Sequence, residues 1–219
     1  MELVKVDNVT KKFGNFKALD NLSISFEAKK QYAIVGSSGS GKSTLLYLMG
    51  GLDKPHSGEI FVEGKSLSKM NDKDLAHYRN TKVGFVFQFH FLLPSINCLE
   101  NILLPAQIGN TLDKKIEHRA KELADHLGVM HCLVKYPHEL SGGEQQRINV
   151  IRALSLKPRM LLCDEPTGNL DSVNSIKVTK LLKDLAREFE ATLAIVTHDL
   201  EVAKSFDHQY HLQDGHLIQ

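Results

Sequence analysis

Apolar and polar positions alternate near the start of the chain, and short unbroken apolar blocks appear further along. Glu2 to Val9 and Leu22 to Phe26 alternate, as strands do when only one face is buried. Tyr32 to Val35 and Met160 to Cys163 are unbroken, which is typical of strands covered on both faces. We predict further strands at residues 58–62, 83–87 and 193–196, and a C-terminal hairpin turning at Asp214-Gly215.

Helical spacing appears between these strands. Its clearest example is an apolar stripe with a glycine placed to end the helix, formed by Ile116, Ala120, Leu123, Ala124, Leu127 and Gly128. Other helices are predicted over residues 42–49, 72–79 and 173–190, and from the Ser141-Gly142-Gly143 turn to just before Pro158. We therefore expect a mostly parallel α/β core, residues 1–88 and 159–219, interrupted by a helical subdomain at residues 89–158.

Composition narrows the class of protein. The 219 residues carry a net charge of +1, which gives no reason to expect a nucleic-acid partner. No apolar run approaches the roughly 18–20 residues that span a bilayer, and the start lacks a signal-peptide pattern. Cys98, Cys132 and Cys163 form no C-x-x-C pair, which favours a reducing cytosolic setting. His131-Cys132 suggests a metal, but its spacing does not fit a zinc site, so none is expected there.

A glycine-rich segment follows the strand that ends at Val35. Residues 36–43 fit the phosphate-loop pattern G-x-x-x-x-G-K-[ST], in which backbone N–H groups at a helix N-terminus face phosphate oxygens. Lys42 supplies a positive charge to the outer phosphates, and the Ser43 hydroxyl is a suitable Mg²⁺ ligand. The alternative is a glycine turn that merely starts a helix. The predicted binding residues are Gly36, Ser37, Ser38, Gly39, Ser40, Gly41, Lys42, Ser43 and Thr44.

Asp164 and Glu165 close the apolar strand that begins at Met160. Ligands gather at the carboxyl ends of strands in open α/β sheets. Asp164 is placed to hold the hydration shell of Mg²⁺, and Glu165 to accept a proton from an attacking water. A strand-end acidic pair that caps a helix is the simpler alternative.

Residues 140–147 read Leu-Ser-Gly-Gly-Glu-Gln-Gln-Arg. Preceded by a phosphate loop and followed by an apolar strand ending in Asp-Glu, this run resembles the signature of the ATP-binding cassette ATPases. The resemblance covers essentially the whole chain. It implies a P-loop NTPase (RecA-like) core with an antiparallel β subdomain and an inserted helical subdomain. It also implies ATP and Mg²⁺ as ligands, and hydrolysis of ATP between two subunits to move a partner.

The resemblance assigns roles that the pattern alone does not. It implies that Gln88 touches Mg²⁺ or the attacking water, and that His198 contacts the terminal phosphate. Phe13 stands where relatives place an aromatic residue against adenine, and Asp171 lies in a loop that bridges the subunits. The alternatives are a surface glutamine, a core phenylalanine and a helix N-cap. The signature residues Ser141, Gly142, Gly143 and Glu144 are implied to bind the nucleotide of a second copy, in a homodimer closed by ATP.

Local details point to one branch of the family. Gly50-Gly51-Leu52-Asp53 and the segment from Gln88 to Pro94 are similar to lipoprotein-releasing and macrolide-exporter ATPases. Such a protein is expected in the cytoplasm, on the inner face of the membrane, with an integral membrane permease docked near Phe89–Leu93. The alternative is that these apolar residues are core of the helical subdomain.

Two classes of cassette ATPase without a transport function are the remaining alternatives. Cassette ATPases that act on ribosomes or DNA usually carry two cassettes or a long coiled-coil insertion, and this chain has neither. A division-type cassette, which transmits force without moving a substrate, stays open beside the transporter and exporter interpretations.

Overall fold

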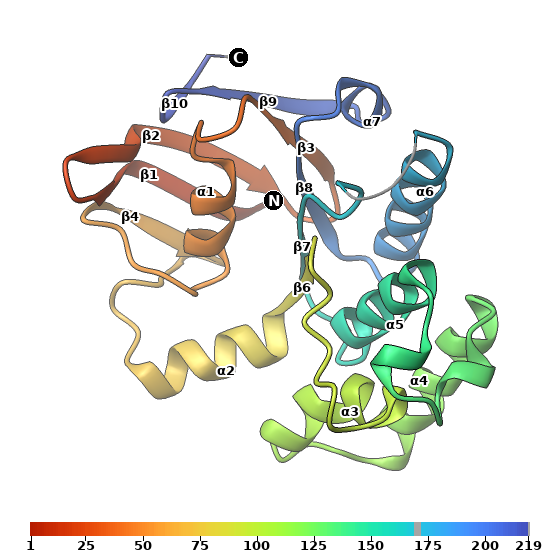
Figure 1. Cartoon of the computed structure of the whole chain (residues 1–219). Helices are drawn as coiled ribbons and strands as arrows, with labels where there is room; N and C mark the ends of the chain where they lie inside the picture. Colours follow the sequence, from red (N-terminus) through yellow and green to blue (C-terminus); the bar gives the residue numbers. More distant parts are fainter. Residues whose placement is uncertain (169–171, 219) are drawn as a thin grey trace.

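The computed structural model describes residues 1–168 and 172–218. Among them, two sheets account for the strands, with helices between and beside them (Figure 1). The strands are β1 (Glu2–Phe13), β2 (Phe16–Glu27), β3 (Gln31–Val35), β4 (Ser57–Val62), β5 (Lys65–Ser66), β6 (Val83–Phe87), β7 (Met160–Asp164), β8 (Thr192–Thr197), β9 (His208–Gln213) and β10 (His216–Leu217). The helices are α1 (Lys42–Met49), α2 (Asp72–Lys82), α3 (Cys98–Ile108), α4 (Lys114–His126), α5 (Gly142–Leu154), α6 (Ser172–Glu188) and α7 (Leu200–Lys204), with 3-10 turns η1 (Met130–Cys132) and η2 (Pro137–Glu139).

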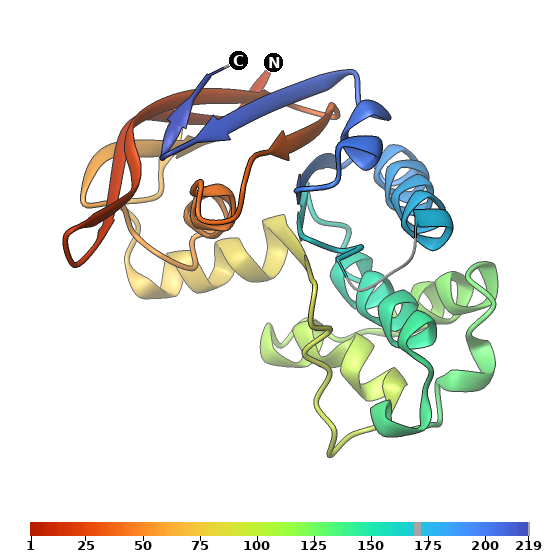
Figure 2. The same ribbon diagram turned by 45° about the horizontal axis from the view of Figure 1, so that its top comes forward.

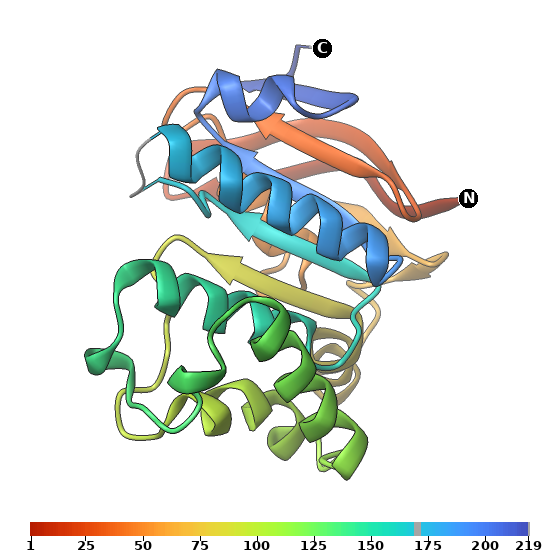
Figure 3. The ribbon, with the colours of Figure 1, turned by 90° about the vertical axis from the view of Figure 1, so that its right-hand side faces the viewer.

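The larger sheet has the strand order β10-β9-β3-β8-β7-β6 and is parallel except for the β9–β10 hairpin. Helix α1 lies between this sheet and the antiparallel sheet β2-β1-β4-β5 (Figure 2). Helices α5 and α6 cover the opposite face of the parallel sheet (Figure 3). The mixed α/β fold with two sheets agrees with the fold class expected from the sequence.

The unbroken apolar blocks do become strands buried on both faces. In β7, Leu161 and Cys163 join the core shared with the helices, whereas Met160 and Leu162 pack toward α1 and the antiparallel sheet. Strand β8 divides its side chains in the same way. Because consecutive side chains of a strand point to opposite faces, each block must be apolar throughout.

The antiparallel sheet is larger than predicted. The alternation marked residues 2–9 and 22–26, but β1 runs on to Phe13 and β2 already begins at Phe16. The register between these strands shifts at several points, and Asn8 and Asn21 have φ near +50°. Each irregularity breaks the period of two, so the alternation fades although the ladder continues.

Residues 89–158, assigned from the sequence to a helical subdomain, contain α3, α4, η1, η2 and α5. Gly128, with φ of +66°, follows the end of α4 as predicted. Helix α3 was not delimited from the pattern, and it accommodates Pro105 in its interior. The buried amide of Asn101 in α3 bonds the N–H of Leu93 at 2.7 Å and its carbonyl at 3.1 Å, which fixes the segment after β6.

The predicted C-terminal hairpin is present, and its turn reaches two other parts of the chain. Asp214 and Gly215 both have positive φ, as a two-residue hairpin turn requires. The carbonyl of Gly215 accepts a bond from the N–H of Asp20 in β2 at 3.0 Å. The N–H of Gly215 donates to the carbonyl of Ser40 at 3.2 Å. The hairpin thus joins the antiparallel sheet to the glycine-rich loop.

Across residues 1–168 and 172–218, no helix combines the length and apolar character needed to cross a membrane.

Candidate functional site

A cavity of about 590 Å³ opens where β3, β7 and β8 end, beside the β1–β2 hairpin. Its volume lies within the range of small-molecule sites. It is lined by Phe13, Phe16, Ala18, Ser38, Gly39, Gly41, Lys42, Ser43, Thr44, Gln88, Glu165 and His198. Residues predicted from widely separated motifs therefore meet in one place.

Two glycines of the loop, Gly36 and Gly41, are required by close backbone approach. A Cβ at Gly36 would lie 2.2 Å from the Leu212 carbonyl oxygen, and one at Gly41 would lie 2.2 Å from that of Ala18. Gly41 also has φ of +100° and caps α1 without a side chain. Gly39 has φ of +80° and open space where a side chain would point. The first N–H groups of α1 therefore face an open cradle suited to an anion.

The Lys42 side chain contacts the backbone of the glycine-rich loop. The side chain is buried, and Nζ donates to the carbonyls of Gly36 at 2.9 Å and Ser37 at 2.8 Å. Burial lowers the pKa of the Lys42 ammonium, while the carboxylates of Glu165 and Asp164 oppose that shift. The positive charge is thus held in place by weak neutral acceptors, which a phosphate oxygen can replace.

Asp164, at the end of β7, faces α1. Its Oδ1 accepts a bond from Ser43 Oγ at 2.8 Å, and its Oδ2 accepts one from Tyr47 Oη at 2.8 Å. Adjacent ligands of Mg²⁺ at 2.0–2.1 Å lie about 3 Å apart, so the spacing of Ser43 Oγ and Asp164 Oδ1 fits this ion. Burial and the bond to Asp164 raise the pKa of Tyr47 to about 12.

Sequence reasoning missed Tyr47 and Phe16. Ser43 and Tyr47 are four residues apart in a helix and share one face, which is a signal that could have identified the tyrosine. Phe16 pairs with Phe13 across the turn between β1 and β2, and both line the cavity. Phe13 is 54% exposed, so its alternative interpretation as a core residue is wrong.

Glu165 follows β7 in a strained conformation, with φ of +46°. Its N–H donates to the Val196 carbonyl at 3.0 Å, which ties it to β8. Nδ1 of His198, the residue after β8, lies 3.0 Å from Oε1 and 2.9 Å from Oε2 of Glu165. The imidazole is largely exposed and the carboxylate largely buried, so this pair joins a buried acceptor to an exposed ring at the cavity.

Gln88 directly follows β6 and lines the same cavity. A Cβ on Gly168 would lie 2.8 Å from Nε2 of Gln88, so the amide packs against the segment after Glu165. The structure therefore brings Gln88 to the carboxyl ends of the strands together with Asp164 and Glu165.

The signature residues Ser141 to Glu144 do not line this cavity. Ser141 caps α5, and Oε2 of Glu144 accepts bonds from the Ser141 N–H at 2.8 Å and hydroxyl at 2.6 Å. The exposed start of α5 is therefore a second helix N-terminus with a hydroxyl, apart from the phosphate loop. Asp171, predicted to bridge two subunits, lies outside the described residues.

Known proteins are similar to this chain in sequence and in fold. A family model described as ABC transporter matches residues 19–168. The lipoprotein-releasing system ATP-binding protein LolD of Cytophaga hutchinsonii is 42% identical over 217 residues, covering 99% of this chain and 99% of that protein. The protein of the same name from Blochmanniella floridana is 46% identical over 214 residues, covering 96% and 91%.

Solved structures of ABC transporter cassettes have a similar fold. A dimeric structure of a bacterial ABC transporter cassette has a TM-score of 0.89 and 36% identity, covering 99% of this chain and 97% of that one. The same cassette in a post-hydrolysis state bound to ADP and Pi matches equally well. With matches across nearly its whole length and a phosphate loop that faces Asp164 and Glu165, the chain belongs to the ABC transporter family as an ATP-hydrolysing subunit.

Proposed function

We propose that this chain powers the release of lipoproteins from the inner membrane, with two copies closing around two ATP to drive an integral membrane permease. The relatives named for lipoprotein release, at 42% and 46% identity over nearly their full length, support the substrate class. The observation that carries the mechanism is the convergence of the phosphate loop, Glu165 and His198 on one cavity, where Asp164 accepts a bond from the lining residue Ser43.

One copy binds most of the nucleotide. The N–H groups of residues 39–43 face the phosphates, and Lys42 exchanges its two carbonyl acceptors for phosphate oxygens. Phe13 and Phe16 present exposed rings at the other end of the cavity, where adenine can stack. A planar base needs no hydroxyl for this contact, so phenylalanine suffices.

Ser43, Asp164 and Gln88 would hold Mg²⁺, which supplies charge neutralisation at the phosphate oxygens when bound. The Asp164 carboxylate is positioned for this by two donors on α1, Ser43 and Tyr47. Because both donors sit on the helix that begins at the phosphate loop, Asp164 and the loop keep a fixed relative position. Gln88 approaches the same region from β6.

Glu165 acts as general base on the attacking water. Its backbone is fixed by the bond to Val196, and its carboxylate is oriented by His198. A carboxylate placed this way takes the proton of the water as the new oxygen–phosphorus bond forms and the bond to the departing ADP oxygen breaks. His198 remains exposed enough to contact the terminal phosphate at the same time.

The second copy contributes Ser141, Gly142, Gly143 and Glu144. In the single chain these residues lie outside the cavity, and the Ser141 hydroxyl donates to Glu144. When a partner's terminal phosphate arrives, that hydroxyl redirects to it, and the N–H groups of α5 add the favourable end of the helix dipole. Cleavage of the phosphate removes the shared ligand, so the copies separate.

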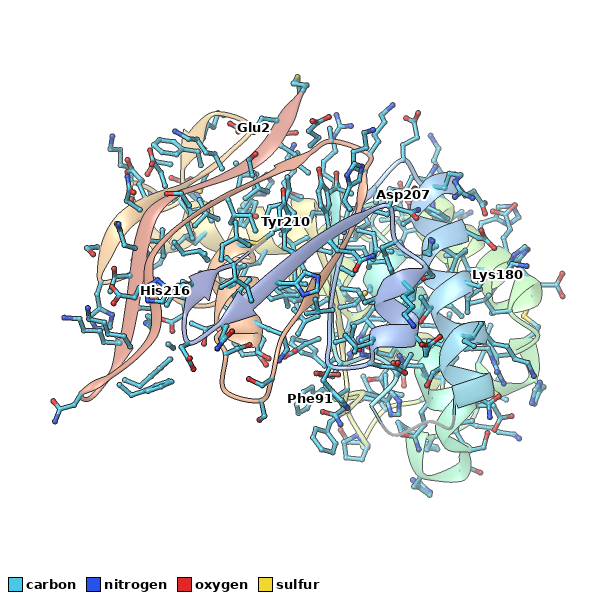
Figure 4. The ribbon with its side chains drawn as sticks, turned by 90° about the horizontal axis from the view of Figure 1, so that it is seen from above. Glu2, Phe91, Lys180, Asp207, Tyr210 and His216 are labelled. Carbon is cyan, nitrogen blue, oxygen red and sulfur yellow. The ribbon has the colours of Figure 1, made fainter. Side chains whose placement is uncertain are left out.

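The permease docks in an apolar groove of about 460 Å³ between α2, α3 and α5. The predicted segment Phe89–Leu93 borders it only in part. Phe91 lines the groove and is 64% exposed, and Figure 4 shows it at the edge of the molecule. Leu92 is partly buried against the core and does not line the groove. An amphipathic helix suits such a groove.

Arg152 connects the groove to the nucleotide. Its guanidinium donates to the carbonyls of Phe91 at 2.8 Å and His90 at 2.7 Å. Arg152 belongs to α5, the helix that carries Ser141 at its start. A permease helix seated on Phe91 thus moves with the helix that binds the partner's nucleotide. Bound to the permease in this way, the chain works peripherally on the inner face of the membrane.

Reconstitution with the permease tests the proposal. We expect ATP-dependent release of a lipidated protein from inner-membrane vesicles, and no stimulation of ATP hydrolysis by macrolides. Macrolide-stimulated turnover without lipoprotein release would assign the chain to the exporter branch. Stimulation by neither, with force transmitted to a cell-wall regulator, would assign it to the division type.

A further inference from the structure

Three side chains of different chemistry converge beside the start of α5. His131 and Cys132 belong to η1, and Glu144 lies in the first turn of α5. His131 Nε2 lies 3.0 Å from Glu144 Oε1, and Cys132 Sγ lies 3.4 Å from the same oxygen. Sγ and Nε2 are themselves 3.4 Å apart. One sulfur, one nitrogen and one oxygen therefore form a nearly regular triangle.

This triangle matches one face of a tetrahedral metal site. Zinc binds thiolate sulfur at about 2.3 Å and nitrogen or oxygen at about 2.0–2.1 Å, which places tetrahedral ligands about 3.3–3.6 Å apart. The observed separations need to open by only a few tenths of an ångström. Mg²⁺ and Ca²⁺ prefer ligand sets made of oxygen, so sulfur and imidazole select a softer ion.

We propose that His131, Cys132 and Glu144 form a binding site for a borderline-soft divalent cation of the Zn²⁺ class. No metal is expected at His131-Cys132 from sequence spacing, because such spacing describes only ligands that lie near one another in the chain. The fold brings the third ligand from the signature motif, which no short spacing pattern contains.

The surroundings of the three ligands are consistent with a partly built site. Cys132 is buried, and the Glu144 side chain is 20% exposed, while that of His131 is 58% exposed. The base of the site is thus fixed in the fold, and its outer side is open to a water as fourth ligand. Glu144 is oriented by Ser141, whose N–H and hydroxyl both bond Oε2 and leave Oε1 to the cation.

Binding needs no oxidant or reductant. The Cys132 thiol, which donates to Glu144 Oε1 in this structure, releases its proton to solvent as the sulfur–metal bond forms. His131 binds through the lone pair of Nε2 in its neutral form. Glu144 keeps its bonds to Ser141 through the other oxygen. The cation therefore ties η1 to the first turn of α5.

Cobalt(II) tests the site because a cobalt–thiolate bond produces a near-ultraviolet charge-transfer band, which the many surface histidines cannot produce. The test uses the nucleotide-free full chain in excess Mg²⁺. We expect the band to saturate at one cobalt per chain and to disappear on addition of Zn²⁺. Cys132→Ala should abolish the band, and His131→Ala should weaken cobalt binding at least tenfold.

Matched variants separate this site from general effects. Cys163→Ala removes another buried thiol, and His138→Ala another imidazole near the signature; both should bind cobalt as the wild type does. Circular dichroism checks folding, and His131→Ala replaces an exposed side chain. A wild type without the band, a band that survives Cys132→Ala, or unchanged binding in His131→Ala would each overturn the proposal.

Discussion

Tyr47 Oη donates to Asp164 Oδ2 at 2.8 Å, so both oxygens of the carboxylate predicted to face Mg²⁺ accept a bond from α1. The Tyr47 hydroxyl is not one of the predicted ligands of phosphate or Mg²⁺. Its effect is to fix the direction in which Asp164 presents its oxygens.

Tyr47→Phe should therefore raise the Mg²⁺ concentration that gives half-maximal ATP hydrolysis. Loss of a partner that orients a metal ligand typically costs about 10- to 100-fold in metal affinity or activity, and we expect the lower end. The rate at saturating Mg²⁺ should fall much less. Tyr78→Phe is the control, because Tyr78 is buried in α2 and donates to the Met49 carbonyl away from the site. An unchanged Mg²⁺ dependence in Tyr47→Phe would refute the positioning role.

Glu165→Gln should slow ATP hydrolysis by roughly 10² to 10⁴-fold, the usual contribution of a positioned base. The amide keeps the shape of the side chain but cannot take the proton. ATP should then hold two copies together, which size exclusion with ATP and Mg²⁺ would report as a doubled mass. Turnover at the wild-type rate would remove Glu165 from the mechanism.

Mixed variants test whether Ser141 serves the other copy's nucleotide. Ser141→Arg blocks the signature and Lys42→Ala the phosphate loop, so a heterodimer of the two retains one intact composite site. We expect nucleotide-bound dimers in the mixture that neither variant forms alone. If both chains fold and the mixture still contains none, Ser141 does not act across a dimer.

Phe89 and Phe91 form a matched pair for the docking groove. Both are 64% exposed, but only Phe91 lines the groove. Phe91→Asp should abolish copurification with the permease and leave ATP binding by the isolated chain nearly unchanged. Phe89→Asp should retain the permease. Equal loss in both variants would indicate a general effect of charge on this segment, and lost ATP binding would indicate a structural role.

Lys11 and Asp53 give the fold a dependence on acid. Lys11 Nζ is buried and donates to Asp53 at 2.6 Å. Burial acts to raise the pKa of Asp53, but the bonds from Lys11 and the Lys54 N–H outweigh it, and the pKa lies below its ordinary value. Such a carboxyl adds stability above its unfolded pKa and loses it as the pH falls through its folded one. The free energy of unfolding, measured with urea, should therefore fall more steeply below about pH 4 in the wild type than in Asp53→Asn. Parallel losses would contradict this.

The sequence predicted best where one local pattern decides the structure. The phosphate loop fixed the start of α1 at Lys42, and the turn at Asp214-Gly215 has the expected positive φ values. Both follow from backbone constraints among neighbouring residues. The predicted strand ends were wrong where bulges break the alternation, as between β1 and β2. Helical spacing puts Tyr47 on the same face as Ser43, but only the packed fold places Asp164 of β7 against that face. The His131–Cys132–Glu144 cluster was missed because Glu144 comes from another element.

The bonds of Gly215 to β2 and to the glycine-rich loop can form only late in synthesis. Residues 36–43 leave the ribosome long before residues 212–215, yet the Leu212 carbonyl lies against Gly36 and the Gly215 N–H holds Ser40. A nascent chain, or one cut before this hairpin, has the loop but lacks the backbone that braces it. The shape of the nucleotide loop therefore depends on backbone from the last strands of the chain as well as on its own glycines.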